Sequence, residues 1–161
     1  MYKDTNKKSS FGNIMEQKQD LFWNTKSLKE MTKAEWESLC DNCGRCCLHS
    51  VQDGKTGKIK LLAVACRHLD TFTCRCLVYK DRFKYEQDCE ALSPDKIRRI
   101  KKLPYSCACR SLIEGRKLGS WHALVSGDPN KVHEAGISVK GKVMTGVHVN
   151  PDDLEYFIVG K

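Results

Sequence analysis

The chain has 161 residues, of which 40% are hydrophobic and 30% charged, and its formal net charge is +8. This length suits one domain with a modest core, and no stretch approaches the roughly 20 consecutive apolar residues that a membrane-spanning helix needs. The first residues are polar and lack the apolar segment of a secretory signal. We therefore expect a cytoplasmic protein that does not cross a membrane.

Residues 1–20 are polar, carry both charges and show no hydrophobic periodicity, so we expect a flexible N-terminal tail there. Residues 21–161 are expected to form a single cysteine-cluster, metal-stabilised domain that binds metal. Its fold class is predicted to be α+β, mostly helical with a short β-hairpin or small sheet.

The first ordered helix is predicted from a capping box. Thr32 and Glu35 have the T-x-x-E spacing in which each side chain bonds the other's backbone N–H, and the helix should continue through Leu39 and Cys40. This helix leads directly into a run of cysteines.

Ten cysteines lie between positions 40 and 109, and four of them fall within the eight residues Cys40–Cys47, spaced as C-x2-C-x2-C-C. Thiolates are soft ligands that select zinc, copper(I) or iron–sulfur clusters. In a reducing compartment so many thiols are more typical of metal ligands than of a disulfide framework. The sequence leaves open which cysteines share a site.

Two backbone paths are open for this run. If the helix continued, positions 40, 43 and 47 would share a face and Cys46 would point elsewhere. If Gly44 broke the helix, the chain would form a knuckle whose backbone amides hydrogen-bond the sulfurs. On either path we expect adjacent Cys46 and Cys47 to diverge.

Downstream, a turn at Asp53–Gly57 separates Val51 from the apolar stretch Ile59–Val64, which predicts a hairpin whose second strand leads to Cys66. No long element is expected between Leu69 and Cys89. A helix is predicted from about Cys107 to Glu114, one or two short strands within 137–149, and a final helical turn around 154–157.

Much of the positive charge lies between Lys96 and Lys117. A helix starting at Pro94 and ending near Leu103 would place its apolar residues on one side and a row of cations on the other. The cations are Arg98, Arg99, Lys101 and Lys102. They predict either a solvated outer face or the binding of an anionic partner, such as RNA or an acidic protein.

Several segments together resemble the bacterial CxxCxxCC family, a zinc- or iron-chelating domain of uncharacterised function. They are the cysteine run with E-W-E-S-L-C before it, A-C-R-H-L at 65–69, T-C-R-C at 73–76 and D-C at 88–89. The resemblance covers about residues 22–149. It implies that the metal ligands come from the family's cysteine positions, here Cys40, Cys43, Cys46, Cys47, Cys66, Cys74, Cys76, Cys89 and Cys107. Cys109 departs from the pattern, since family members tend to carry an aromatic residue there.

Two histidines, His49 and His68, each follow a cysteine by two residues and are further candidate ligands. The run is a poor match to a ferredoxin, because Cys47 comes immediately after Cys46 and no proline follows. No catalytic motif is present, so catalytic residues remain unassigned and an enzymatic role is open.

Three functions are consistent with the sequence. The leading hypothesis is a cytosolic metal-binding protein that chelates zinc or an iron–sulfur centre. The second is an iron–sulfur or thiol redox enzyme, or an accessory to one. The third is a metal-stabilised adaptor that binds nucleic acid or an acidic protein through the basic helix.

Overall fold

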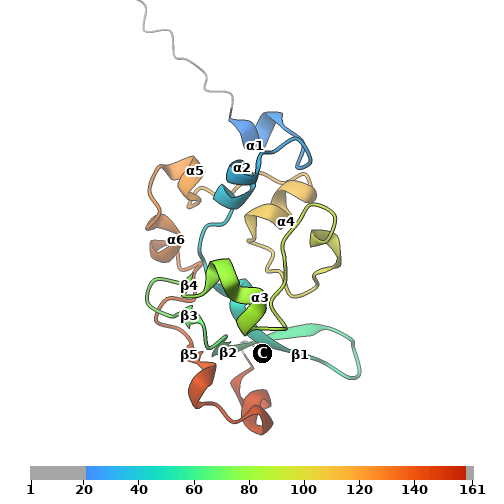
Figure 1. The fold of residues 1–161 in the computed structure, drawn as a ribbon, viewed down its shortest axis with the longest axis vertical. Helices are drawn as coiled ribbons and strands as arrows, with labels where there is room; N and C mark the ends of the chain where they lie inside the picture. Colours follow the sequence, from blue (N-terminus) through green and yellow to red (C-terminus); the bar gives the residue numbers. More distant parts are fainter. Residues whose placement is uncertain (1–20, 159–161) are drawn as a thin grey trace, which may run out of the picture.

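The computed structural model describes residues 21–158, so the predicted tail at 1–20 lies outside the described residues (Figure 1). Short helices surround two small sheets, which confirms the α+β class. The α-helices are α1 (Phe22–Thr25), α2 (Lys33–Ser38), α3 (Arg82–Tyr85), α4 (Ala108–Ile113), α5 (Ala123–Ser126) and α6 (Lys131–Glu134). The 3-10 helices are η1 (Arg45–Cys47), η2 (Tyr79–Asp81), η3 (Ile97–Arg99), η4 (Gly146–His148) and η5 (Pro151–Phe157). Within residues 21–158, no helix is long and apolar enough to cross a membrane.

The strands form two sheets. They are β1 (Leu48–Gln52), β2 (Ile59–Ala65), β3 (Leu69–Asp70), β4 (Arg75–Cys76) and β5 (Met144–Thr145). The larger sheet has the order β1-β2-β5, with β1 and β2 antiparallel and β5 parallel to β2, while β3 and β4 form a separate antiparallel pair. The predicted hairpin is confirmed, and the Asp53 carboxylate holds its turn by accepting from the N–H groups of Lys55 (3.0 Å) and Thr56 (2.9 Å).

The capping box of α2 is also confirmed. The Thr32 hydroxyl accepts from the Glu35 N–H at 3.2 Å, and the Glu35 carboxylate accepts from the Thr32 N–H at 2.7 Å. The helix ends at Ser38, so Cys40 lies beyond it rather than in it. Trp36 anchors the helix, since its indole N–H donates to the Leu92 carbonyl at 3.0 Å.

The basic helix expected from Pro94 to Leu103 does not form. Only η3, three residues long, is helical there, and turns flank it. Ile97 and Leu103 are buried and Ile100 is half-buried, so the apolar residues recur every third position. That spacing matches the three residues per turn of 3-10 structure and lacks the i+4 contacts that support an α-helix. The four cations therefore do not form one helical face.

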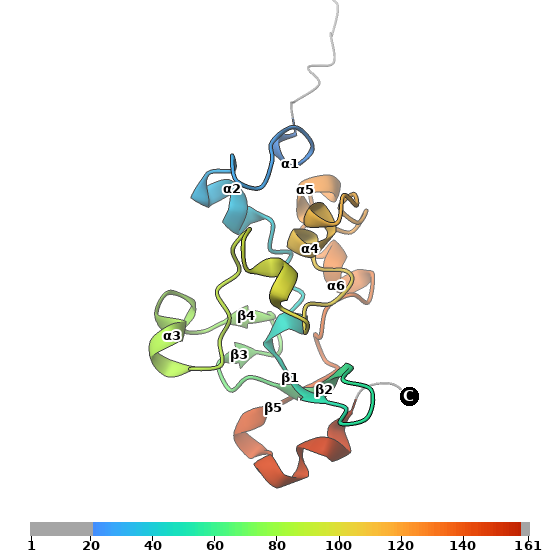
Figure 2. The ribbon, with the colours of Figure 1, turned by 90° about the vertical axis from the view of Figure 1, so that its right-hand side faces the viewer.

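Later elements agree better with expectation. Helix α4 occupies the predicted segment, a single short strand β5 lies within 137–149, and η5 forms the last helical turns. Helices α5 and α6 were not predicted. Figure 2 shows the helices α1, α2, α4 and α5 gathered at one end of the molecule, and η5 at the other.

Two small hydrophobic clusters form the core. The first contains Leu39, Ile97, Leu103, Ala108 and Cys109. The second contains Leu48, Ala65, Leu69, Cys74 and Val139. The cysteine run connects them, since it begins directly after Leu39 and ends directly before Leu48.

Candidate metal centre

Gly44 determines the path of the cysteine run. Its φ of 73° lies in the left-handed region, and a Cβ there would lie only 2.7 Å from Cγ2 of Val139. The chain turns at this glycine and enters η1, which carries Cys46 and Cys47. Of the two predicted paths, the structure therefore adopts the knuckle.

Backbone amides approach the sulfurs, as expected for a knuckle. Burial raises the pKa of the Cys43 thiol and of the Cys66 thiol, whereas the N–H groups of Arg45 and His68, each two residues later, act to lower it. Desolvation likewise raises the pKa of Cys40, and the N–H of Asn42 opposes this. These amides favour the charged thiolate, the form that binds metal.

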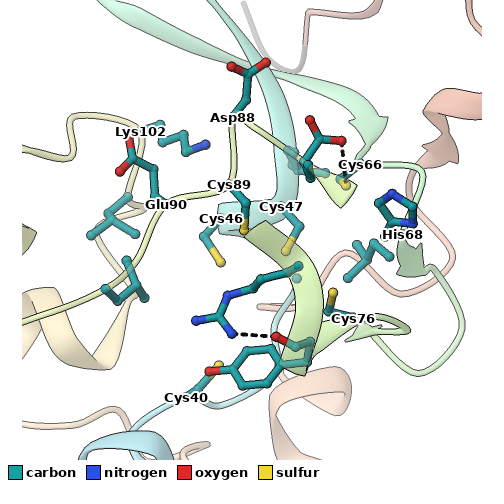
Figure 3. Close-up of a pocket in the computed structure, with 18 of the residues that line it drawn as sticks. Cys40, Cys46, Cys47, Cys66, His68, Cys76, Asp88, Cys89, Glu90 and Lys102 are labelled. Atoms are coloured by element: carbon teal, nitrogen blue, oxygen red, sulfur yellow. Dashed lines mark hydrogen bonds between the residues drawn. The ribbon is translucent and has the colours of Figure 1, made fainter. Parts of the chain in front are cut away.

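The sulfurs face a cavity of about 420 Å³. Eight of the ten cysteines line it, namely Cys40, Cys46, Cys47, Cys66, Cys74, Cys76, Cys89 and Cys109. Figure 3 shows the sulfurs of Cys46, Cys47, Cys76 and Cys89 directed toward one central space, with Cys40 and Cys66 at its edges. The cavity touches both cores, since Leu103 lines it from the first and Leu69 from the second.

Adjacent Cys46 and Cys47 do not diverge, contrary to expectation. A hydrogen bond between the two side chains is the main reason that the pKa of Cys46 lies well above its ordinary value, and burial raises it further. The tight 3-10 turn of η1 places both sulfurs on the cavity side (Figure 3). Both can therefore serve the same site.

Three predicted ligands are less accessible. Cys43 is buried and does not line the cavity, and Cys74 lines it but is buried in the second core. Cys107 precedes α4, and a hydrogen bond from Cys109 lowers its pKa to about 7. Cys109, which is not among the predicted ligands, is buried in the first core while touching the cavity.

The histidines separate into two groups. His49 and His68 line the cavity, and Figure 3 shows His68 near Cys66. His122 is 1% exposed and lies in the core, where Nε2 is 3.1 Å from the Leu39 carbonyl oxygen and Nδ1 accepts from the Leu124 N–H at 3.1 Å. Its role is structural.

Sequence reasoning missed the charged side chains of the cavity wall. Glu86 lies 3.7 Å from the Cys66 sulfur, which donates to Oε2, and the cations Arg82 and Lys102 also line the cavity. The sequence pattern places Lys102 on a helix face instead. No spacing signal marks these residues, because they come from short turns whose folding depends on the cysteine-rich segments around them.

The donor set fits a zinc or iron centre, since free thiols outnumber the four ligands that either metal requires. The positions of these donors, however, do not yet form a metal site. Among the side chains of residues 21–158, no three Cys, His, Asp or Glu groups already stand close enough to hold a metal ion. Binding would therefore need the sulfurs that face the central space to move closer together.

Comparisons with known proteins agree with the chemistry of the cavity. The CxxCxxCC family model, described as "Putative zinc- or iron-chelating domain", matches residues 39–108. The chain is 50% identical to a UPF0260 protein of Granulibacter bethesdensis over 138 residues, 86% of this chain and 82% of the relative. It is 49% identical to a UPF0260 protein of Cellvibrio japonicus over 141 residues, 88% of this chain and 96% of the relative. A Brucella canis relative is 50% identical over 135 residues, 84% of this chain and 89% of the relative. No solved structure matches the chain.

Proposed function

Because this chain belongs to the UPF0260 family of uncharacterised proteins, and because thiols crowd its central cavity, we propose that it binds a zinc or iron centre through cysteine thiolates. The observation that carries the proposal is the direction of four sulfurs, those of Cys46, Cys47, Cys76 and Cys89, toward one space (Figure 3). Four thiolates are the complete ligand set of a structural zinc ion, at sulfur–zinc distances of about 2.3 Å.

We take these four as the primary ligands. Cys40 and Cys66 lie at the edge of the same cavity and are alternative ligands, while Cys43, Cys74 and Cys107 remain candidates that would need larger movement. The domain that binds the metal is proposed to span residues 21–161. A reducing compartment such as the bacterial cytoplasm keeps the ten thiols free, so we propose that the protein works there.

An iron–sulfur centre is the second form of the proposal. It is favoured by the number of thiols and by the cavity volume of about 420 Å³, which exceeds what a single zinc ion needs. The chemistry it would supply is electron transfer, whereas zinc would supply a structural link or a Lewis acid. Visible absorbance of protein purified without oxygen distinguishes the two, because iron–sulfur protein is brown and zinc protein is colourless.

Metal retention in cysteine variants tests the proposal. Cys76→Ala and Cys89→Ala, each prepared in the full chain, should lose most of the bound metal after dialysis. Cys109→Ala is the matched control, because it removes a thiol that departs from the family pattern and should retain the wild-type metal content. If Cys76→Ala and Cys89→Ala retain the wild-type metal content as Cys109→Ala does, Cys76 and Cys89 are not ligands.

A further inference from the structure

The cavity is larger than a metal ion and its ligands require. Its volume of about 420 Å³ lies within the roughly 300–1,000 Å³ of pockets that hold small organic molecules. One part of its lining is apolar, with Trp36, Leu92 and Ile100, while the sulfurs line another. There is space for an organic molecule beside a metal centre.

Arg82 lines this cavity and is held in place. Its Nη1 donates to the Tyr79 carbonyl at 2.6 Å, and its guanidinium carbon lies 4.1 Å from the centre of the Tyr79 ring and 4.4 Å from that of Phe83. Among residues 21–158, no hydrogen-bond or ion-pair partner is found for Nε or Nη2. That edge of a guanidinium is the one that binds a carboxylate or phosphate through two parallel hydrogen bonds.

Lys102 is the second cation in the cavity wall, and it forms no ion pair with any residue in the described part of the chain. Other lysines do so, for example Lys84 with Asp81 at 2.7 Å. Both cations line the same cavity as the Cys89 sulfur.

We propose that this cavity binds a small organic oxyanion, a carboxylate or phosphate with an apolar body, through Arg82 and Lys102, which both line it. Its apolar part would pack against Trp36 and Ile100. This inference rests on the proposed function in one respect, which is that the oxyanion lies beside the metal. The metal site would then be of the open kind that admits a ligand, rather than a closed structural site.

The competing explanation is that the two cations only balance the negative charge of the cavity. That charge comes from the thiolates and from four carboxylates that also line the cavity, Glu37, Glu86, Asp88 and Glu90. This explanation predicts that replacing either cation weakens metal binding and that no oxyanion is selected. Both explanations can be tested on the full-length, zinc-loaded protein with three probes of similar size, namely benzoate, phenyl phosphate and the neutral benzamide.

Binding is followed by tryptophan fluorescence and by the NMR signal of the Trp36 indole N–H, which reports on the cavity directly. We expect saturable binding of benzoate or phenyl phosphate, with benzamide at least about tenfold weaker because a charged hydrogen bond is lost. Arg82→Met and Lys102→Met should each weaken oxyanion binding by on the order of tenfold. Lys80→Met is the control, since Lys80 is exposed on the same segment, does not line the cavity and should change nothing.

Metal content is measured in each sample to keep the two proposals apart. Oxyanion binding by a wild-type protein that takes up no metal would support the oxyanion site and refute the metal proposal. Metal binding without any preference for benzoate or phenyl phosphate over benzamide would overturn the oxyanion site. The same conclusion would follow if both cation variants bound the oxyanions as tightly as the wild type.

Discussion

Gly44 is the residue on which the geometry of the cysteine run depends most. Its backbone occupies the left-handed region, and the position where a Cβ would stand is blocked by Val139, a residue of the second core. The Cys43 carbonyl accepts from the Val139 N–H at 2.9 Å, which holds the two segments together at this point. A side chain at Gly44 would separate them.

We predict that Gly44→Ala destabilises the protein by about 2–4 kcal/mol, from left-handed strain plus overpacking. Gly115→Ala is the control, because Gly115 has a similar φ of 71° and a Cβ added there would meet nothing within 4 Å. Gly115→Ala should lower the free energy of unfolding by only about 1 kcal/mol, the cost of the left-handed backbone without the overpacking. Urea unfolding of both variants measures the difference, and equal destabilisation would show that the contact with Val139 is unimportant.

At this scale the sequence identified the thiols but could not rank them. Cys74 and Cys76 are two residues apart and would share a face in a regular strand. The positive φ of Cys74 (57°) breaks that alternation, so Cys74 is buried in the second core and only borders the cavity, while the Cys76 sulfur points into it. Such a local backbone reversal at a residue other than glycine has no signal in the sequence.

Among the elements, α5 is joined to the end of α2 by a single buried side chain. His122 is the N-cap of α5: its Nδ1 accepts from the Leu124 N–H, and its other ring nitrogen reaches the Leu39 carbonyl. As Nδ1 is the acceptor, Nε2 carries the proton and donates to Leu39. This imidazole thus satisfies two backbone groups that would otherwise be buried without partners.

We predict that His122→Ala costs about 2–5 kcal/mol of folding free energy, because it leaves a void and two unsatisfied backbone groups. His148→Ala should change stability by less than about 0.5 kcal/mol, since His148 is exposed. Thermal unfolding and metal analysis of both variants provide the check. A folded His122→Ala protein that has lost its metal would instead mean that this histidine serves the metal centre.

Helix α6 contains a group whose charge should matter near neutral pH. Burial lowers the pKa of His133 below its usual value, and Nδ1 lies 2.7 Å from the Ser138 hydroxyl oxygen. The folded state therefore favours the neutral ring. The resulting stability is complete above the unfolded pKa of about 6.5 and declines as the pH falls below it, since the unfolded chain then binds the proton more readily.

Lowering the pH from 7.5 to 5.5 should therefore destabilise the wild type more than His133→Gln. Urea unfolding of both proteins at the two pH values measures this, and taking the difference removes any pH effect that they share. If the difference in unfolding free energy between the two proteins is the same at both pH values, or changes in the opposite direction, His133 does not favour the neutral ring in the folded state.

Elements with strong local signals were predicted well. The α2 capping box and the Asp53 turn of the β1–β2 hairpin each act within their own segment, and α4 is followed by Gly115 in the left-handed region. The basic segment around η3 failed because its apolar residues recur every three positions, which an α-helix and a series of 3-10 turns both tolerate. Helices α5 and α6 are four residues each, too short to show a period.

The whole molecule is organised as two small cores with the thiol cavity in contact with both. Cysteines from the run, from β4 and from the segment after α3 face that cavity, so a bound metal would link parts of the chain that are some 40 residues apart. Structural zinc contributes on the order of 10 kcal/mol of apparent binding energy, comparable with the 5–15 kcal/mol of net stability of an ordinary domain.

Removing the metal should therefore loosen the fold. We expect a strong chelator to lower the unfolding temperature by on the order of tens of degrees, or to abolish the cooperative transition. Circular dichroism before and after chelation follows the change, and readdition of zinc or iron should reverse it. An identical melting curve after proven metal loss would show that the two cores are stable without the link.

The central claim is that the cavity thiols hold a zinc or iron centre, and the metal content of the full chain purified without oxygen tests it most directly. Elemental analysis should find zinc or iron in stoichiometric amount that survives dialysis, and a thiol titration of the native protein should find the cavity cysteines protected. A folded chain that contains neither metal and leaves those thiols freely reactive would contradict it.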